Sequence, residues 1–250
     1  MIRVVLLGLG NVGVHMGKAF IDSDQIELVQ IYDRAKKNTI AFDASISITD
    51  KIENIQEADV YVIAISDDAI SEFSKQLKFK QGLVVHTSGT VPLDALKCSA
   101  NKGVFYPLQT FTKKQEIDFK NIPIVFEVQD QEDFQLLERL SESISNQVFN
   151  LDSQQRKYLH LAAVFANNFT NYMYKIAYDI CEEHEVPFDL IKPLILETAA
   201  KAQSVIPMEA QTGPAKRNDK KVIENHLLLL NKNQKEIYTL VTNSITNSLK

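Results

Sequence analysis

The sequence predicts an α/β domain, built on a parallel sheet with helices on both faces, followed by an all-helical domain. In the first 150 residues, short apolar runs rich in β-branched residues alternate with helical segments, which is typical of such a sheet. From Asp152 onward no run is typical of a strand, and helical segments continue to the end. We therefore place the domain boundary at residue 150, giving domains of residues 1–150 and 151–250.

The expected strands are nearly continuous apolar runs, as strands buried on both faces require. They cover residues 2–7, 27–32, 59–65, 82–86, 103–106 and 122–127. Helices are expected at residues 14–21, 34–43, 68–77, from Thr90 with Pro92 in its first turn, 153–183, 187–205, 219–229 and 232–248. Pro193 is expected to kink the helix that contains it.

The composition excludes several classes of protein. Lys and Arg number 27 and Asp and Glu number 32, a net charge of −5 that gives no bulk attraction to nucleic acid. No apolar run approaches the ~18 residues needed to cross a membrane, and no signal peptide is visible. Cys98 and Cys181 lack metal-ligand spacing and are expected to be small buried residues, so no metal site is predicted. We expect a soluble cytoplasmic protein.

Glycines are concentrated near the amino terminus. The chain has only 8 glycines, yet Gly8, Gly10 and Gly13 form a G-x-G-x-x-G motif between a strand and a helix, and Asp33 follows Gly13 by 20 positions. Gly8 permits a tight turn, Gly10 lets the backbone approach a pyrophosphate, and Gly13 lets the helix pack close to the sheet. The motif predicts a dinucleotide at the helix N-terminus, with a tight turn that binds no ligand as the alternative.

The intervening Asn11 and Val12 are also expected to contact the cofactor. Asp33 would accept hydrogen bonds from a ribose 2′-hydroxyl, which favours NAD. Arg34, with Lys36 and Lys37 behind it, would instead hold the 2′-phosphate of NADP, although the lysines could belong to a solvated helix face. The choice between NAD and NADP stays open on these residues.

Polar residues follow several strands, at the sheet edge where open α/β sheets bind ligands. Ser66 ends one strand and is expected to contact the cofactor, and Gln109 after another is a candidate for binding substrate. His86 is a possible proton donor, or a histidine hydrogen-bonded within its loop. Ser88 is a possible ligand for substrate or nicotinamide, with local loop hydrogen bonding as the alternative. Thr90 is expected to cap a helix.

The long helix that starts at Ser153 is apolar around most of its circumference and is therefore expected to be buried. His160, Asn167 and Asn171 lie within about 60° of one another on it, and Asn168 lies about 60° from Asn171. Buried amides need hydrogen-bond partners, either in the protein or in a ligand. His160 is a second possible acid, and Asn168 is a candidate near the substrate. We expect this helix to wall the cofactor crevice.

A turn at Gly213-Pro214 separates two later helices. Thr212 before it and Arg217 after it are candidates for binding substrate. Lys216 and Arg217 would suit an anionic group, although a solvated basic loop is the alternative.

Together these segments resemble, over nearly the whole chain, the bacterial Rossmann-like family catalogued as domain of unknown function 2520. The matching stretches are residues 8–13, 86–90, 104–111, 161–168 and 212–215, with Arg217 and Asp219. The resemblance implies a Rossmann domain and a helical domain of the 6-phosphogluconate dehydrogenase C-terminal type, similar to pyrroline-5-carboxylate reductase and the β-hydroxyacid dehydrogenases. It also implies an NAD(P)-dependent oxidoreductase, commonly a homodimer, and favours NADP.

One position departs from the β-hydroxyacid dehydrogenases. Those enzymes place a catalytic lysine four residues before the asparagine that Asn168 matches, and here that position is Val164. Valine donates no proton, so the resemblance to imine reduction is better preserved.

We therefore predict an NAD(P)H-dependent oxidoreductase that transfers hydride to a C=N or C=O carbon of a small molecule held between the domains, with His160, Asn168, Ser88 and His86 as catalytic candidates. The alternatives are a dinucleotide-binding regulatory protein without turnover and, third, an enzyme that takes its hydride from a reduced deazaflavin.

Overall fold

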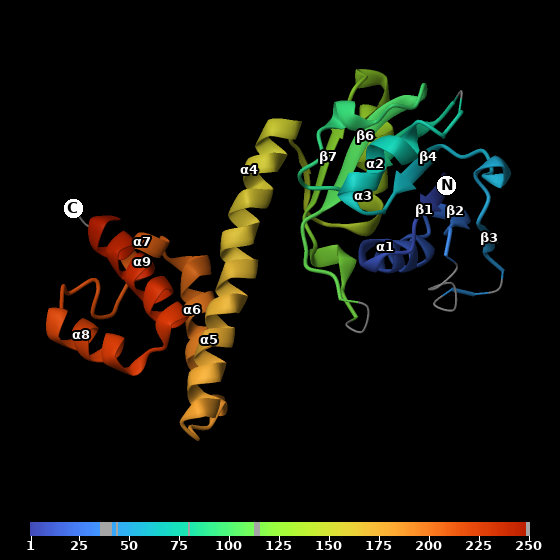
Figure 1. Cartoon of the computed structure of the whole chain (residues 1–250). Helices are drawn as coiled ribbons and strands as arrows, with labels where there is room; N and C mark the ends of the chain where they lie inside the picture. Colours follow the sequence, from blue (N-terminus) through green and yellow to red (C-terminus); the bar gives the residue numbers. More distant parts are fainter. Residues whose placement is uncertain (36–41, 44, 80, 113–115, 249–250) are drawn as a thin grey trace. The chain divides into compact units, whose positions relative to one another are not determined.

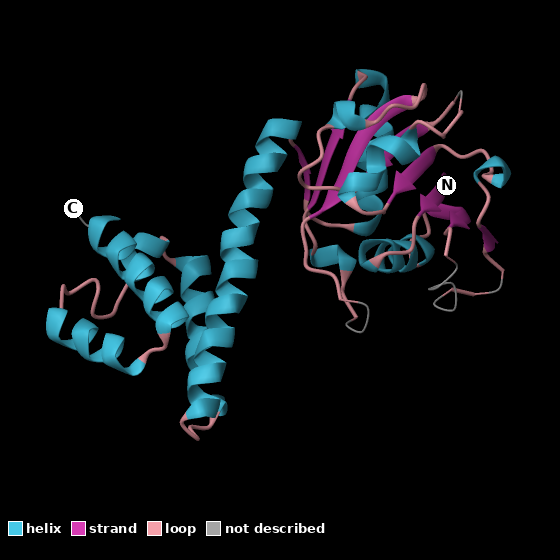
Figure 2. Ribbon diagram, in the orientation of Figure 1, coloured by secondary structure: helices cyan, strands magenta, loops and turns pink. Residues whose placement is uncertain are grey.

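The structure is a computed structural model that describes residues 1–35, 42–43, 45–79, 81–112 and 116–248. Its residues form two compact units, Met1–Val164 and Phe165–Lys250. All the strands described lie in the first unit, and after them the chain forms only helices and loops (Figure 2). The sheet ends at Asn150, whereas the two units divide at residue 164, within a helical stretch.

The first unit is built on an 8-stranded sheet, in the order β3-β2-β1-β4-β5-β6-β7-β8 (Figure 1). Its strands are β1 Ile2–Leu7, β2 Ile26–Tyr32, β3 Ser47–Thr49, β4 Val60–Ile63, β5 Leu83–His86, β6 Asn101–Pro107, β7 Ile124–Val128 and β8 Val148–Asn150. Each apolar run expected to form a strand does so. The three-residue strands β3 and β8 were not expected, because they are too short to show a periodic pattern.

Neighbouring strands are parallel except for β6 and β7, which are antiparallel. The expected parallel arrangement is therefore confirmed for the sheet as a whole and departs from the expectation at this one pair. A parallel return needs a long crossover, usually a helix. The described part of the connection from β6 to β7 holds only the 3-10 turn Phe119–Asn121, so β7 pairs in the opposite direction.

Two apolar cores lie on opposite faces of the sheet, because alternate residues of a buried strand point to opposite sides. In β1, Val4 and Leu6 belong to one core, and Val5 and Leu7 belong to the other. The first core also contains side chains of α1, Asn11–Ile21, and α3, Phe134–Ile144. The second contains Ile70 of α2, Asp67–Ser74. Helices thus cover both faces, as predicted.

Helix α3 was missed in the sequence, although Phe134, Leu137, Leu140 and Ile144 recur at helical spacing. The helix expected from Thr90 does not form, and only the 3-10 turn Leu93–Ala95 follows β5. The helix expected at residues 34–43 falls mostly outside the described residues. Cys98 and Cys181 are free and buried, as predicted.

The long helix begins at Ser153, where Asp152 and Gln155 form a capping box. It comprises α4, Ser153–Ala163, a π-helical turn, Val164–Phe169, and α5, Thr170–Glu183. The expectation that this helix is buried is wrong for the single chain. Leu161 is 51% exposed, Phe165 62% and Phe169 50%.

The remaining helices belong to the second unit. They are α6 Lys192–Ser204, α7 Pro207–Ala210, α8 Lys220–Leu229 and α9 Lys232–Ser248. Pro193 does not kink α6 as expected, because it lies in the first turn, where no intrahelical N–H is needed. Among the described residues, no helix combines the length and apolar character required to span a membrane.

Replacing Leu137 in α3 with alanine should reduce the free energy of unfolding of the first unit by about 2–5 kcal/mol, because the side chain is fully buried against the sheet. Gln135→Ala, on an exposed position of the same helix, should change it by less than about 0.5 kcal/mol. Urea denaturation of both variants measures the difference. Equal effects would contradict this placement of α3.

Candidate functional site

The loop between β1 and α1 is shaped by two glycines that the fold itself requires. Gly8 has a φ of +108°, and a Cβ there would lie 2.7 Å from the carbonyl oxygen of Ala64. A Cβ on Gly13 would lie 2.1 Å from the carbonyl oxygen of Gly8. Both contacts are too short for any side chain, so the missing side chains let α1 pack closely against the loop and β4.

Gly10 differs from its neighbours, because its φ of −68° suits any residue and a Cβ there would meet only the Ala64 oxygen, at 3.6 Å. The fold therefore does not need glycine at this position. Gly10 is exposed and is the N-cap of α1, with no side-chain hydrogen bond to the first turn. A helix N-terminus of this kind directs N–H groups and a partial positive charge toward an anion. The arrangement fits the pyrophosphate of a dinucleotide.

A cavity of about 420 Å³ lies at this loop. It is lined by Gly8, Leu9, Gly10, Asn11, Val12, Asp33, Ala35, Ala64, Ile65, Ser66 and Thr87. The structure thus brings together most of the residues expected to bind the cofactor. Gly13 lies beneath the loop, whereas Arg34 is exposed and does not line the cavity. Lys36 and Lys37 lie outside the described residues.

Two contacts hold the rim of this cavity. The Asp33 carboxylate, directly after β2, accepts a hydrogen bond from the Leu9 N–H at 3.4 Å. The Asn11 side chain donates to the Phe111 carbonyl at 3.1 Å, which ties the start of α1 to the segment after β6. Asp33 therefore lies beside the glycine loop, as contact with a ribose hydroxyl requires.

His86, the last residue of β5, is fully buried. Its Nδ1 accepts a hydrogen bond from the Ser88 N–H at 3.2 Å, and its Nε2 has no partner among the described residues. Burial, together with the nearby Arg156 guanidinium, lowers the pKa of His86 to about 4. The imidazole is neutral at pH 7, which argues against the expected role of His86 as proton donor.

Ser88 closes the loop after β5. Its hydroxyl accepts hydrogen bonds from the N–H groups of Thr90, at 3.1 Å, and Val91, at 3.0 Å. This is the local role that the sequence offered as the alternative to ligand binding. Thr90 caps no helix, and its hydroxyl instead donates to the Asp67 carboxylate at 2.8 Å. The ends of β4 and β5 are thereby joined.

Tyr106 and His160 form a hydrogen-bonded pair at the end of β6. Tyr106 is buried in β6, and its hydroxyl lies 3.0 Å from Nδ1 of His160 on α4. Burial raises the pKa of Tyr106 to about 12, so the phenol stays protonated at pH 7. Gly89 leaves room for the pair, because a Cβ there would lie 2.6 Å from Nδ1 of His160 and 2.9 Å from the Tyr106 hydroxyl.

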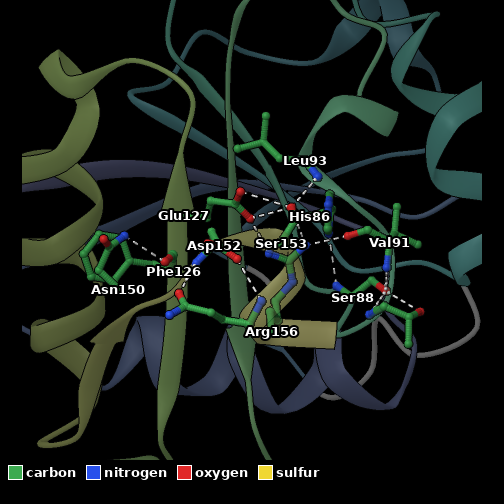
Figure 3. A network of polar contacts seen from close by, with 12 residues as sticks. His86, Ser88, Val91, Leu93, Phe126, Glu127, Asn150, Asp152, Ser153 and Arg156 are labelled. Atoms are coloured by element: carbon green, nitrogen blue, oxygen red, sulfur yellow. Dashed lines mark hydrogen bonds and ion pairs between the residues drawn. The ribbon is translucent and has the colours of Figure 1, made fainter. Parts of the chain in front are cut away.

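A buried arginine holds the first turn of α4 in place (Figure 3). The Arg156 side chain is 0% exposed and pairs with the Glu127 carboxylate of β7. Its guanidinium also donates to the Val91 carbonyl at 2.6 Å, and the Ser153 hydroxyl donates to Glu127 at 2.7 Å. Arg156 therefore links α4 to β7 and to the loop after β5, one helical turn before His160.

Sequence analysis assigned no role to Tyr106, Glu127 or Arg156. Tyr106 lies in an expected strand, residues 103–106, whose pattern does not distinguish a phenol with a partner from an ordinary core residue. A lone arginine in a polar helical turn gives no indication that it is buried, since its partners Glu127 and Val91 are distant in sequence.

The remaining candidate residues lie away from the Tyr106–His160 pair and the Arg156–Glu127 pair, either on the surface of the first unit or in the second unit. Gln109 is exposed, and its side chain accepts a hydrogen bond from the Thr110 N–H at 2.8 Å. Asn168, Thr212 and Arg217 belong to the second unit and are exposed there. Asn168 lies in the π-helical turn, and the other two lie in the segment before α8. Among the described residues, no group of acidic, histidine and cysteine side chains is arranged to hold a metal ion.

Comparison with known proteins agrees with this architecture. The family model described as a domain of unknown function (DUF2520) matches residues 122–245. A solved protein of Bacteroides fragilis, provisionally assigned as an NADP oxidoreductase, is 36% identical, with a TM-score of 0.87 and coverage of 98% of each chain.

The chain belongs to the DUF2520 family. More distant structures share its fold, a Rossmann domain with a helical carboxyl-terminal part. The 1-pyrroline-5-carboxylate reductase of Streptococcus pyogenes is 12% identical, with a TM-score of 0.66 and coverage of 98% of each chain. The reductive aminase of Aspergillus terreus, in complex with NADPH and ethyl levulinate, is 12% identical, with a TM-score of 0.73 and coverage of 100% of this chain and 94% of the other. No curated protein matches this DUF2520 chain.

The buried His86 should make the stability of this DUF2520 protein sensitive to acid. Its pKa is about 4 when folded and close to 6.5 when unfolded, so below pH 6.5 the unfolded state binds the extra proton. Stability is therefore lost as the pH falls from 6.5 toward 4. Between pH 7 and pH 5 this one group should lower the free energy of unfolding by about 2 kcal/mol.

Urea denaturation at pH 7 and pH 5 measures this loss. His86→Asn, whose side-chain oxygen can still accept from the Ser88 N–H, should reduce the loss by about 2 kcal/mol. His184→Asn, at an exposed position, should leave it unchanged. An identical loss in all three proteins would refute the assignment to His86.

Proposed function

We propose that this chain is an NAD(P)H-dependent oxidoreductase that transfers hydride to a C=N or C=O carbon of a small molecule. The observation that carries the proposal is the open glycine at position 10. Its backbone caps α1 without a side chain, although the fold has room for a Cβ there. A ligand that approaches the backbone closely accounts for glycine at this position. The oxidoreductase assignment of the 36% identical relative agrees with this.

Gly8, Gly10, Asn11 and Val12 would hold the pyrophosphate at the start of α1, and Asp33 would contact the ribose. Gly13 would keep the loop close to α1, and Ser66 would line the far side of the same cavity. When bound, the reduced nicotinamide supplies the hydride. Asp33 favours NAD, whereas Arg34 and the family favour NADP. We propose NADP, because the relative assigned as an NADP oxidoreductase covers the whole Rossmann domain.

Reduction of a C=N or C=O bond also needs a proton at the nitrogen or oxygen. Val164 donates none, and His86 is neutral and buried. His160 is half-buried at the strand ends and is the proton donor that the site offers. Asn168, Thr212 and Arg217 of the second unit are proposed to contact the substrate. We propose that Ser88 does not contact the substrate but holds the loop after β5 in shape, through its hydrogen bonds to the Thr90 and Val91 N–H groups.

We further propose that the protein works as a cytoplasmic homodimer. Large apolar side chains on the helices stay exposed in the single chain, including Leu194, Leu196, Leu228, Leu229 and Leu240. Apolar surface of this extent is typical of chains that associate. Both cysteines are free thiols, which fits a reducing compartment.

A turnover assay distinguishes the proposed enzyme from the alternative, a regulatory protein that binds a dinucleotide without reducing a substrate. With NADPH or NADH present, a panel of cyclic imines and β-keto acids should yield at least one substrate whose reduction oxidises the cofactor, measured by the loss of absorbance at the nicotinamide band. We expect imines to react faster, because Val164 replaces the proton donor of β-hydroxyacid chemistry. Tight cofactor binding with no oxidation by any member would favour the regulator. Displacement of NADPH by a reduced deazaflavin would favour that donor.

Gly10→Ala should weaken NADPH binding about tenfold or more, because the added methyl group projects where the pyrophosphate would lie. The variant should keep its melting temperature, since the fold has room for the Cβ, at 3.6 Å from its nearest neighbour. Calorimetric titration with NADPH and NADH measures the first effect, and thermal unfolding without cofactor measures the second. Unchanged affinity for both cofactors would contradict the proposed site.

A further inference from the structure

The two ring nitrogens of His160 have different surroundings. Nδ1 lies 3.0 Å from the Tyr106 hydroxyl. No hydrogen bond to another described residue involves Nε2, and the side chain is only half-buried. The ring is thus held at one nitrogen and available at the other.

Tyr106 controls which nitrogen carries the proton. A hydroxyl can either donate or accept a hydrogen bond, and burial keeps this phenol protonated. Beside a neutral imidazole, Nδ1 is the one acceptor that the described residues offer to this buried hydroxyl, and donation there places the imidazole proton on Nε2. Beside a cationic imidazole it accepts from the Nδ1–H, and Nε2 again carries a proton. In both of these arrangements, Nε2–H is a donor that no described residue uses.

The space at Gly89 and the anchored first turn of α4 fix where the ring lies. Gly89 leaves the space in which Tyr106 and His160 meet, because any Cβ there would overlap both. Arg156 lies four residues before His160, on the same side of α4, and is fixed by Glu127 and by the Val91 carbonyl. Val91 and Gly89 belong to the same loop. The hydrogen bond from Arg156 to the Val91 carbonyl therefore also fixes Gly89 relative to α4.

We propose that Tyr106 is a positioning residue that keeps His160 as an Nε2–H donor, and that this nitrogen protonates the heteroatom of the reduced bond. The proposal rests on the proposed function. Addition of hydride to the carbon forms a C–H bond and moves the π-electron pair to the nitrogen or oxygen. The Nε2–H bond of cationic His160 breaks, and its proton goes to that pair. The imidazole becomes neutral with its remaining proton on Nδ1, where it donates to the Tyr106 hydroxyl oxygen, and Nε2 then regains a proton from the solvent.

The tautomer can be measured without a substrate, by ¹⁵N NMR of histidine-labelled protein at a pH where the imidazoles are neutral. In the wild type, His160 should show a protonated Nε2 and an unprotonated Nδ1. Tyr106→Phe removes only the hydroxyl and should produce a mixture of tautomers. Gly89→Ala should produce the same mixture, because its Cβ displaces the ring.

Tyr238→Phe is the matched control. Tyr238 makes the same type of bond, at 2.9 Å, to Nδ1 of His226 in the second unit. Its loss should alter the His226 resonances and leave those of His160 unchanged. A proton on Nδ1 of His160 in the wild type, or an unchanged tautomer in Tyr106→Phe, would overturn the proposal.

Kinetics with NADPH and the cyclic imine 2-methyl-1-pyrroline test the proton transfer. Tyr106→Phe should lower kcat about tenfold with KM changed less than about twofold, and His160→Gln should lower kcat about 100-fold. Equal kcat values in the wild type and His160→Gln would overturn the role of His160. Lack of turnover by the wild type with this imine and with every other member of the panel would count against the proposed function, whereas the NMR result would still decide the role of Tyr106.

Discussion

The buried guanidinium of Arg156 is the interaction on which the strand-end site depends. It joins the first turn of α4 to β7 through Glu127 and to the loop after β5 through the Val91 carbonyl. Removing one partner of such a pair typically costs about 3–5 kcal/mol, because a charge is left buried and unpaired. An apolar side chain of similar volume could stabilise the fold equally well. The ion pair fixes the position of α4 on the sheet, because its hydrogen bonds are directional. It thereby also fixes the position of His160.

The two histidines of this region differ mainly in how deeply they are buried. His86 is fully buried, and its pKa is lowered by burial and by Arg156, so that its ring is a neutral part of the core. His160 is only half-buried, and its Nδ1 is paired with a phenol rather than a charge. This difference in burial is the reason that the proposed function assigns proton transfer to His160 and not to His86.

The glycine loop shows a comparable division between fold and function. Gly8 and Gly13 are needed to avoid overlap of the loop with β4 and with itself. Gly10 has an ordinary backbone conformation and an open side, so the fold does not require glycine there, whereas the proposed cofactor does. The three glycines of the motif therefore serve two purposes. Gly8 and Gly13 avoid steric overlap, and only Gly10 can be replaced without straining the backbone.

The sequence by itself determined the six longer strands, the glycine turn and the change to helices after residue 150, because each follows from local spacing of apolar residues and glycines. It also located Asp33, Ser66 and His160 as candidates, since these lie at predictable places relative to strands and a helix. The tertiary structure decided the direction of β7, the protonation of His86 and the pairing of Tyr106 with His160. These depend on partners far away in the chain, with 54 residues separating Tyr106 from His160 and 29 separating Arg156 from Glu127. Desolvation and these hydrogen bonds arise only when such segments pack together, so they cannot be predicted from the local pattern of residues in the sequence.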